Sequence, residues 1–221
     1  MRVYYLTGSQ IALGNIALRR LRISRFSDLN DPFELLAVEL ADKRHRAAFR
    51  KNKEQIDQKR GLLCFTRFWH NPLVWGHYAE KHTGICLGFD VPDELLAPVI
   101  YAERPAKIRI DPKTNMPILS EQLLNRLLRT KFSDWKYEEE IRLFVELDHK
   151  TRESGSYFYS FSETLVLREI ILGPRCEIPI AKVRDLVTSF EQPVNVVKSR
   201  IAARSFRVVE SRNESGLGQG T

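Results

Sequence analysis

Short runs of β-branched and aromatic residues recur along this chain, and segments with helical spacing interrupt them at irregular intervals. The strand candidates are residues 2–6, 21–25, 61–65, 85–89, 99–101, 107–110, 137–147, 157–161, 164–172, 194–197 and 206–209. The helix candidates are residues 10–20, 34–60, 73–81, 121–130 and 178–190. A regular βαβ array would alternate strands with helices. The irregular order instead predicts an α+β fold.

The chain length suits one globular domain, which we expect over residues 1–210. Residues 211–221 are polar and glycine-rich, so they are expected to form a disordered tail. No apolar run reaches the roughly 18–20 residues that span a bilayer, and the N-terminus has no signal-peptide pattern. The three cysteines form no CxxC pair. We therefore expect a cytoplasmic protein that contacts no membrane and has no disulfide framework.

The formal net charge of +7 favours polyanions such as nucleic acid or a phosphate-bearing cofactor. The basic residues are dispersed, and the densest stretch, residues 43–60, is interpreted as a solvated helix face rather than a nucleic-acid arm. A nucleic-acid or protein partner thus stays possible, and the oligomeric state stays open.

The common signatures of cofactor, metal and nucleophile sites are missing from the sequence, which has no GxGxxG, GxxxxGK[ST], HExxH or GxSxG. Three histidines, His70, His77 and His82, follow one another at spacings of seven and five, which do not match a helical i,i+4 metal pair. We therefore expect no metal site at these histidines.

A first polar cluster, RISRFSDLNDPFE, covers residues 22–34 and surrounds a turn after a strand. It contains Arg22, Arg25, Asn30, Asp31 and Glu34. These residues could serve structure, because Asp and Asn form Asx-turns and a glutamate suits the start of a helix. They could also serve a reaction directly.

A second cluster covers residues 64–90 and combines Thr66 with aromatic side chains. Trp75 and Tyr78 are three residues apart and would share one face of a helix. The pair could pack in the core, or it could form a wall on which a planar ring stacks.

The third cluster is DWKYEEEIRLF, residues 134–144. If residues 137–147 form one strand, alternation places Glu138, Glu140 and Arg142 on one face and Glu139 on the other, apolar face. The two same-face glutamates would then lie about 6.5–7 Å apart. Such a triplet could orient a ribose and stabilise a cation, or it could be a solvated ion pair of little energetic value.

In this order, the clusters resemble a group of uncharacterised bacterial proteins related to the AbiGi abortive-phage-resistance proteins. The matching segments are residues 4–7 (Y-x-x-T), 21–34 (ending in NDPFE), 65–89 (containing W-x-x-Y-A), 135–142 (WxYExExR) and 169–173 (EIILG). The resemblance implies a role in phage defence or in a toxin–antitoxin locus.

The order of elements also resembles, more loosely, the ADP-ribosyltransferase superfamily. That resemblance implies a central, mostly antiparallel split sheet with flanking helices, and NAD as substrate. It makes Glu140 the catalytic carboxylate, with Glu138 as its ExE partner and Arg142 beside them. The residues that it implies for NAD binding are Tyr5, Thr7, Arg22, Arg25, Thr66, Trp75 and Tyr78. The first strand lacks the superfamily's His or Arg, unless Arg2 or Arg22 replaces it.

Three function classes follow. The leading one is an ADP-ribosyltransferase-like or NAD-consuming enzyme. The alternative is a non-enzymatic, antitoxin-like regulatory module that binds nucleic acid or a protein. The third is a metal-dependent nuclease, which would need Asp31, Glu34, Glu138 and Glu140 to converge on one cation.

Overall fold

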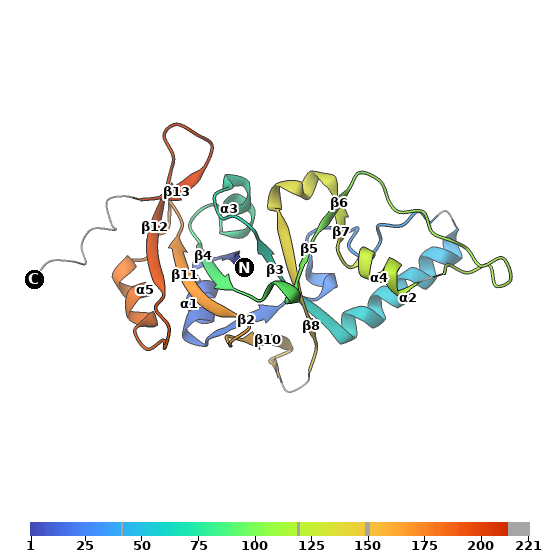
Figure 1. Ribbon diagram of the computed structural model, residues 1–221, viewed down its shortest axis with the longest axis horizontal. Helices are drawn as coiled ribbons and strands as arrows, with labels where there is room; N and C mark the ends of the chain where they lie inside the picture. Colours follow the sequence, from blue (N-terminus) through green and yellow to red (C-terminus); the bar gives the residue numbers. More distant parts are fainter. Residues whose placement is uncertain (41, 119, 149–150, 212–221) are drawn as a thin grey trace, which may run out of the picture. The chain divides into compact units, whose positions relative to one another are not determined.

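The computed structural model describes residues 1–40, 42–118, 120–148 and 151–211, which fold into two compact units (Figure 1). Unit 1 comprises residues 1–22, 65–95 and 158–211, and unit 2 comprises residues 23–64 and 96–157, within those described ranges. Strands and helices mix irregularly in both, so the predicted α+β class is confirmed. The boundaries of a single domain over residues 1–210 stay a prediction, and nearly all of the expected tail, residues 212–221, lies outside the described part.

Unit 1 is built on a mixed sheet whose strands run in the order β13, β12, β11, β4, β1. Their bounds are β1 Arg2–Thr7, β4 Ile85–Asp90, β11 Val166–Leu172, β12 Asn195–Ile201 and β13 Val208–Glu210. Only the β11–β12 pair among them is parallel; the other neighbours are antiparallel. The sheet of this unit is therefore mostly antiparallel.

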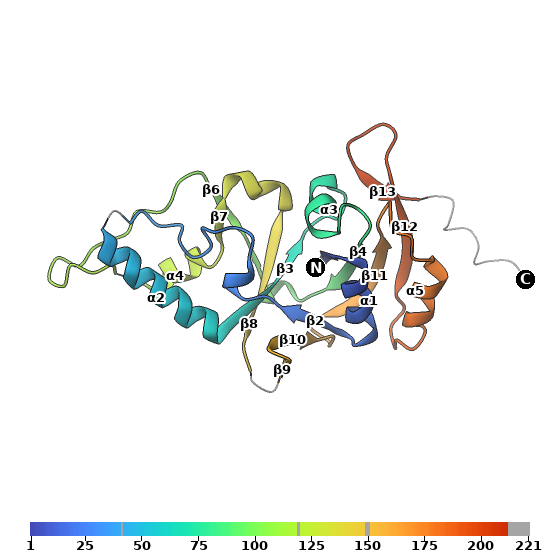
Figure 2. The ribbon, with the colours of Figure 1, turned by 180° about the vertical axis from the view of Figure 1, so that it is seen from behind.

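Three helices accompany that sheet: α1 Ser9–Ala17, α3 Pro72–Tyr78 and α5 Ile180–Val187, of which α1 and α5 contact each other (Figure 2). The start of α3 follows from its sequence, because the Asn71 side chain accepts a hydrogen bond from the Leu73 amide and Pro72 occupies the first turn. A short 3₁₀ turn, Asp93–Leu95, ends the middle segment of the unit.

Unit 2 contains the strands β5 Leu96–Pro98, β6 Ile100–Ala102, β7 Thr130–Phe132, β8 Glu140–Glu146 and β9 Arg152–Glu153. β8 lies between β5 and β3 (Arg60–Thr66), whereas β6 and β7 form a separate parallel pair. Three strands, β2 Arg20–Ile23, β3 and β10 Ser156–Ser160, cross from one unit's residue range into the other's.

The helical elements of unit 2 are α2 Lys43–Lys59, α4 Glu121–Leu127 and the 3₁₀ turns Phe26–Asp28 and Ser133–Glu138. The helices α2 and α4 and the turn Phe26–Asp28 share an apolar core with β3. Its buried members are Phe26, Leu35, Val38, Phe49, Leu62, Leu127 and Leu128. Burial of each large side chain of this kind stabilises the fold by about 1.5–3 kcal/mol.

Two expected elements of unit 2 differ in the structure. The predicted helix over residues 34–60 begins only at Lys43, because Leu35 has a left-handed φ of 62° and Val38 forms a β-bridge with Ala106. The predicted strand over residues 107–110 is reduced to an isolated bridge between Ile110 and Pro117. Among the described residues, no helix combines the length and apolar character that a membrane span requires.

Candidate functional site

The third sequence cluster lies where a 3₁₀ turn meets strand β8 in unit 2. The turn Ser133–Glu138 ends, Glu139 takes a left-handed φ of 44°, and β8 begins at Glu140. The prediction of one strand over residues 137–147 was therefore wrong at its start. Both Glu138 and Glu140 are nevertheless buried, while Glu139, at the left-handed position between the turn and β8, is exposed.

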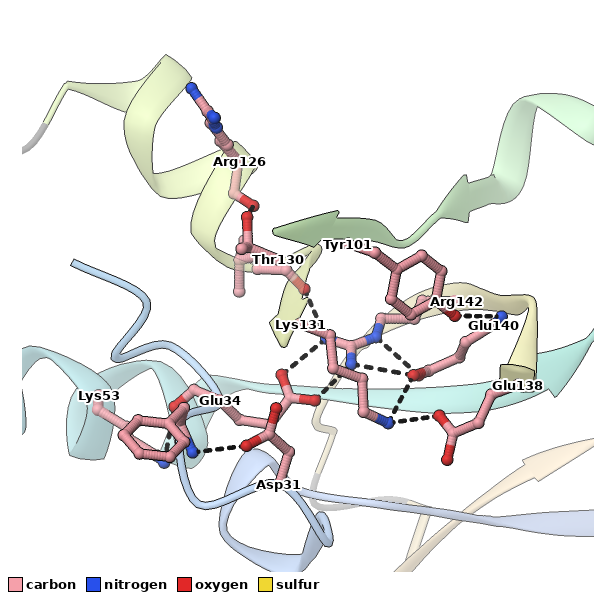
Figure 3. Close-up of polar contacts among 12 residues, drawn as sticks. Asp31, Glu34, Lys53, Tyr101, Arg126, Thr130, Lys131, Glu138, Glu140 and Arg142 are labelled. Carbon is pink, nitrogen blue, oxygen red and sulfur yellow. Dashed lines mark hydrogen bonds and ion pairs between the residues drawn. The ribbon is translucent and has the colours of Figure 1, made fainter. Parts of the chain in front are cut away.

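Lys131, on β7, joins the two buried glutamates (Figure 3). Its Nζ donates to Oε2 of Glu138 at 2.6 Å and to Oε2 of Glu140 at 3.1 Å. The same amine lies 4.7 Å from the centroid of the Trp135 ring, in a cation–π contact. Lys131 is itself buried, so it is an internal counterion rather than a surface lysine.

Arg142, on β8, ties this group to the first sequence cluster. Its Nη1 and Nη2 donate to the two carboxylate oxygens of Glu34 at 2.9 and 2.5 Å, and Nε donates to Oε1 of Glu140 at 2.8 Å (Figure 3). Nη1 also donates to the Leu128 carbonyl at 2.8 Å. The guanidinium is fully buried, at 0% exposure. We call Glu34, Lys131, Glu138, Glu140 and Arg142 the ion network.

The NDPFE segment holds Glu34 in place through its own turn. Oδ1 of Asp31 accepts from the Phe33 amide at 2.9 Å, and the Asp31 carbonyl accepts from the Glu34 amide at 3.1 Å. Nζ of Lys53, on α2, donates to the Glu34 carbonyl at 2.8 Å. The Asx-turn expected from the sequence is thus present, and it serves to aim a glutamate inward.

The network shifts the acidity of its own members. Burial opposes ionisation of Glu140, but Arg142 and Lys131 outweigh it and lower the pKa of that carboxyl. At Glu34 burial is the largest effect, and it raises the pKa despite the pairing with Arg142. The pKa of Lys131 is raised, because Glu140 and Glu138 outweigh its desolvation. Glu140 is therefore held ionised, whereas Glu34 takes up a proton more readily than a free glutamate.

Two further groups of unit 2 contact Glu140. The Tyr101 hydroxyl accepts a hydrogen bond from the Glu140 amide at 2.8 Å, and burial raises the pKa of this phenol to about 12. Cys64, on β3, has a pKa raised well above its ordinary value, first by burial and then by Glu140. This thiol is consequently protonated near neutral pH.

A pocket of about 330 Å³ adjoins the network in unit 2. Its lining is mostly apolar and consists of Phe33, Ala37, Ala102, Glu103, Arg104, Pro105, Thr130, Lys131 and Phe132. Phe33 and Phe132 are both exposed, at 61% and 43%. Side-chain alternation directs Thr130 and Phe132 to one face of β7 and Lys131 to the other. Lys131 belongs both to the pocket lining and, through its amine, to the ion network.

Most residues that the sequence suggested for NAD binding lie in unit 1: Tyr5, Thr7, Arg22, Thr66, Trp75 and Tyr78. Trp75 is fully buried, and its Nε1 donates to the Trp69 carbonyl at 2.5 Å, so this ring packs in the core. The Thr66 hydroxyl donates a hydrogen bond to the Phe68 carbonyl at 3.1 Å. Arg25 belongs to unit 2, where it lies 3.9 Å from Asp57. Glu138, Glu140 and Arg142 also belong to unit 2.

The sequence interpretation missed Lys131, which was placed just after a helix ending at residue 130. Strand β7 is only three residues long, and a single Lys between Thr and Phe carries little strand signal. The position of Lys131 depends on the pairing of β7 with β6, where Tyr101 is its register partner. Its ion pair with Glu138 depends on the 3₁₀ turn that ends at Glu138. Neither relationship can be read from local spacing.

The described residues contain no group of three or more His, Cys, Asp or Glu side chains arranged to hold a metal ion. The carboxylates of Glu34, Glu138 and Glu140 do converge, but on Lys131 and Arg142. Cations of the chain itself therefore occupy the positions that a nuclease metal would need. His70 contacts the Val208 carbonyl through Nδ1 at 2.9 Å.

A family model described as a protein of unknown function (DUF2971) matches residues 74–143 of the chain. The matched segment contains Lys131, Glu138, Glu140 and Arg142. It supports the prediction of a resemblance to an uncharacterised family, without naming phage resistance or ADP-ribosyl transfer. No curated protein and no solved structure matches the chain significantly.

Proposed function

We propose that this protein is an ADP-ribosyltransferase-like enzyme that consumes NAD, with the ion network as its acidic centre. One observation carries the proposal: in the described part of the chain, three buried carboxylates, Glu34, Glu138 and Glu140, converge on two buried cations, Lys131 and Arg142. With all five ionised, the network has an excess of one negative charge. A buried negative excess favours a positively charged group nearby.

NAD supplies such a group, because its nicotinamide ring is cationic and its ribose gains oxocarbenium character when the glycosidic bond breaks. In the proposed reaction the bond between ribose C1′ and nicotinamide nitrogen breaks, and nicotinamide leaves with the bonding pair. Water or a target nucleophile attacks C1′ and releases its proton to solvent. Glu140, kept ionised by its neighbours, stabilises the positive charge, and Glu138 orients the ribose. Arg142 positions Glu140 through its Nε.

The adjoining pocket supports the proposal by its size and lining. Its volume of about 330 Å³ falls within the range of small-molecule sites and is large enough for one of the two bases of NAD. Phe33 and Phe132 offer faces for stacking, and Arg104 offers a cation for the pyrophosphate. The motif resemblance to AbiGi-related proteins supports a role in phage defence, with a nucleic acid or a protein as the target of modification.

Incubation of purified protein with NAD, followed by chromatography of released nicotinamide, tests the proposal. We expect release by the wild type and a several-fold rise in KM for Phe132→Ala. Met116→Ala serves as the matched control, since Met116 is a similarly exposed apolar residue outside the pocket lining. Absence of both binding and release, with a folded protein, would reject the proposal.

The non-enzymatic module remains the second candidate, because both oxygens of Glu140 already accept hydrogen bonds from Lys131 or Arg142. A saturated carboxylate of this kind suits a structural role. Under this alternative, the wild type releases no nicotinamide, and substitution of Phe132 changes the affinity for a partner only.

A further inference from the structure

The β12–β13 hairpin of unit 1, residues 195–210, ends in a loop that extends beyond the neighbouring strands (Figure 1). Its register pairs Ser199 with Glu210 and Ile201 with Val208. The loop is closed by backbone bonds, since the Ala202 amide donates to the Arg207 carbonyl at 3.0 Å. The tip of the hairpin is therefore an ordered turn.

The base of the hairpin is fixed to the rest of unit 1. Val208 is fully buried, and its amide donates to the His70 carbonyl at 2.9 Å. Ser199 is buried as well, and its hydroxyl donates to the Leu172 carbonyl at 2.7 Å. A rigid base holds the exposed tip in a defined direction.

An aromatic side chain stands at that tip. Phe206 is 97% exposed, the most exposed of the large hydrophobic residues in the described part of the chain. No ring contact covers it among the described residues. One exposed aromatic residue is unremarkable alone, so its meaning depends on what surrounds it.

Three arginines lie on the same hairpin as Phe206. Arg200, Arg204 and Arg207 are all exposed, and none of them forms an ion pair with a carboxylate of the described residues. Arg200 and Arg204 line an open hollow of about 680 Å³ together with Ala203, Ser205 and Val209, and Glu210 is the acidic residue of that lining. The hairpin thus combines a strongly basic surface with a free aromatic ring.

We propose that this hairpin binds single-stranded nucleic acid, with Phe206 stacked on an unpaired base and the three arginines on the phosphates. Stacking on a side chain needs a base that is already free of its duplex neighbours, which favours a single strand over a duplex. Guanidinium groups bind phosphate oxygens in a bidentate manner. The inference does not rest on NAD chemistry, because its residues and its assay are separate from those of the ion network.

Fluorescence anisotropy with a labelled mixed-sequence oligonucleotide, without NAD, tests the inference. The wild type should bind the single strand more tightly than the matching duplex. Phe206→Ala should weaken binding by about tenfold. The double substitution Arg204→Gln and Arg207→Gln should weaken binding and reduce the magnitude of the slope of log affinity against log salt by about 1.4.

Two controls make the result decisive. Phe68→Ala removes another exposed phenylalanine of unit 1 and should leave the affinity unchanged. Arg50→Gln with Lys51→Gln removes two exposed cations of α2, the other basic surface, and should change it little. The inference is overturned if no binding occurs up to about 100 µM, the weak end of non-specific association. It is also overturned if the α2 variant loses affinity while the hairpin variants do not, or if the duplex binds better than the single strand.

Discussion

Arg142 and Glu34 are 108 positions apart in the chain, yet they form a buried, two-pronged ion pair at 2.5 and 2.9 Å. The pair joins the NDPFE segment to the WxYExExR segment inside unit 2. Two motifs that looked independent in the sequence are therefore parts of one network. Its centre is Arg142, which also donates to Glu140 and to the Leu128 carbonyl.

Substitution of Arg142 should destabilise unit 2 strongly. Arg142→Met removes the guanidinium that pairs with Glu34 and the Nε donor of Glu140, and a broken buried pair costs about 3–5 kcal/mol. Arg142→Lys should destabilise unit 2 almost as much, because an ammonium cannot bind both oxygens of Glu34 in the same geometry. Urea denaturation measures the loss, and Arg109→Gln, at an exposed position of unit 2, should change the midpoint little.

A double substitution separates the attraction within the pair from the cost of stranding a charge. Glu34→Leu combined with Arg142→Met removes both charges, while Lys131 still pairs with Glu140. The double variant should recover at least half of the stability that the single Arg142→Met loses. If the stability losses of the two single variants add up to the loss of the double variant in this double-mutant cycle, the two side chains do not act as a pair.

The network should give two opposite pH dependences. The pKa of Glu140 is lowered on folding, so its stabilisation is present above the ordinary value of 4.5 and is lost as pH falls through the folded pKa. The pKa of Glu34 is raised, so its contribution is present below 4.5 and is lost as pH rises through the folded pKa.

Denaturation of three proteins between about pH 3 and 7 tests these signs. The stability of the wild type minus that of Glu140→Gln should increase with pH. The difference for Glu34→Gln should decrease with pH. Two differences that change in the same direction would contradict the assigned acidities.

The left-handed conformation of Glu139 predicts an unusual ranking of substitutions. Glu139→Gly should be neutral or stabilising, because glycine adopts a φ of 44° without steric cost. Glu139→Val should lose about 1–3 kcal/mol, since a β-branched residue is strained in this region. Thermal unfolding compares the two variants, and equal melting temperatures would argue against the turn.

Much of the fold could be predicted because its strands follow β-branched and aromatic runs. Residues 85–89 and 164–172 were placed within two residues of the observed β4 and β11. The site could be predicted only in part. The 3₁₀ turn that ends at a left-handed Glu139 was missed, because a glutamate at that position gives no glycine-like signal. The pairing of Glu34 with Arg142, and of Lys131 with both glutamates, depends on tertiary contacts that local patterns do not encode.

The glutamate triplet provides the most direct test of the proposed chemistry. Nicotinamide release from NAD should be measured for the wild type, Glu138→Gln and Glu139→Gln, with thermal unfolding of each as a control for folding. Glu139 is the matched control, since it is adjacent in sequence but exposed. The account predicts release by the wild type and by Glu139→Gln, and at least a hundredfold slower release by a folded Glu138→Gln (~2.7 kcal/mol). Equal rates for the two variants, or no release by the folded wild type, would contradict it.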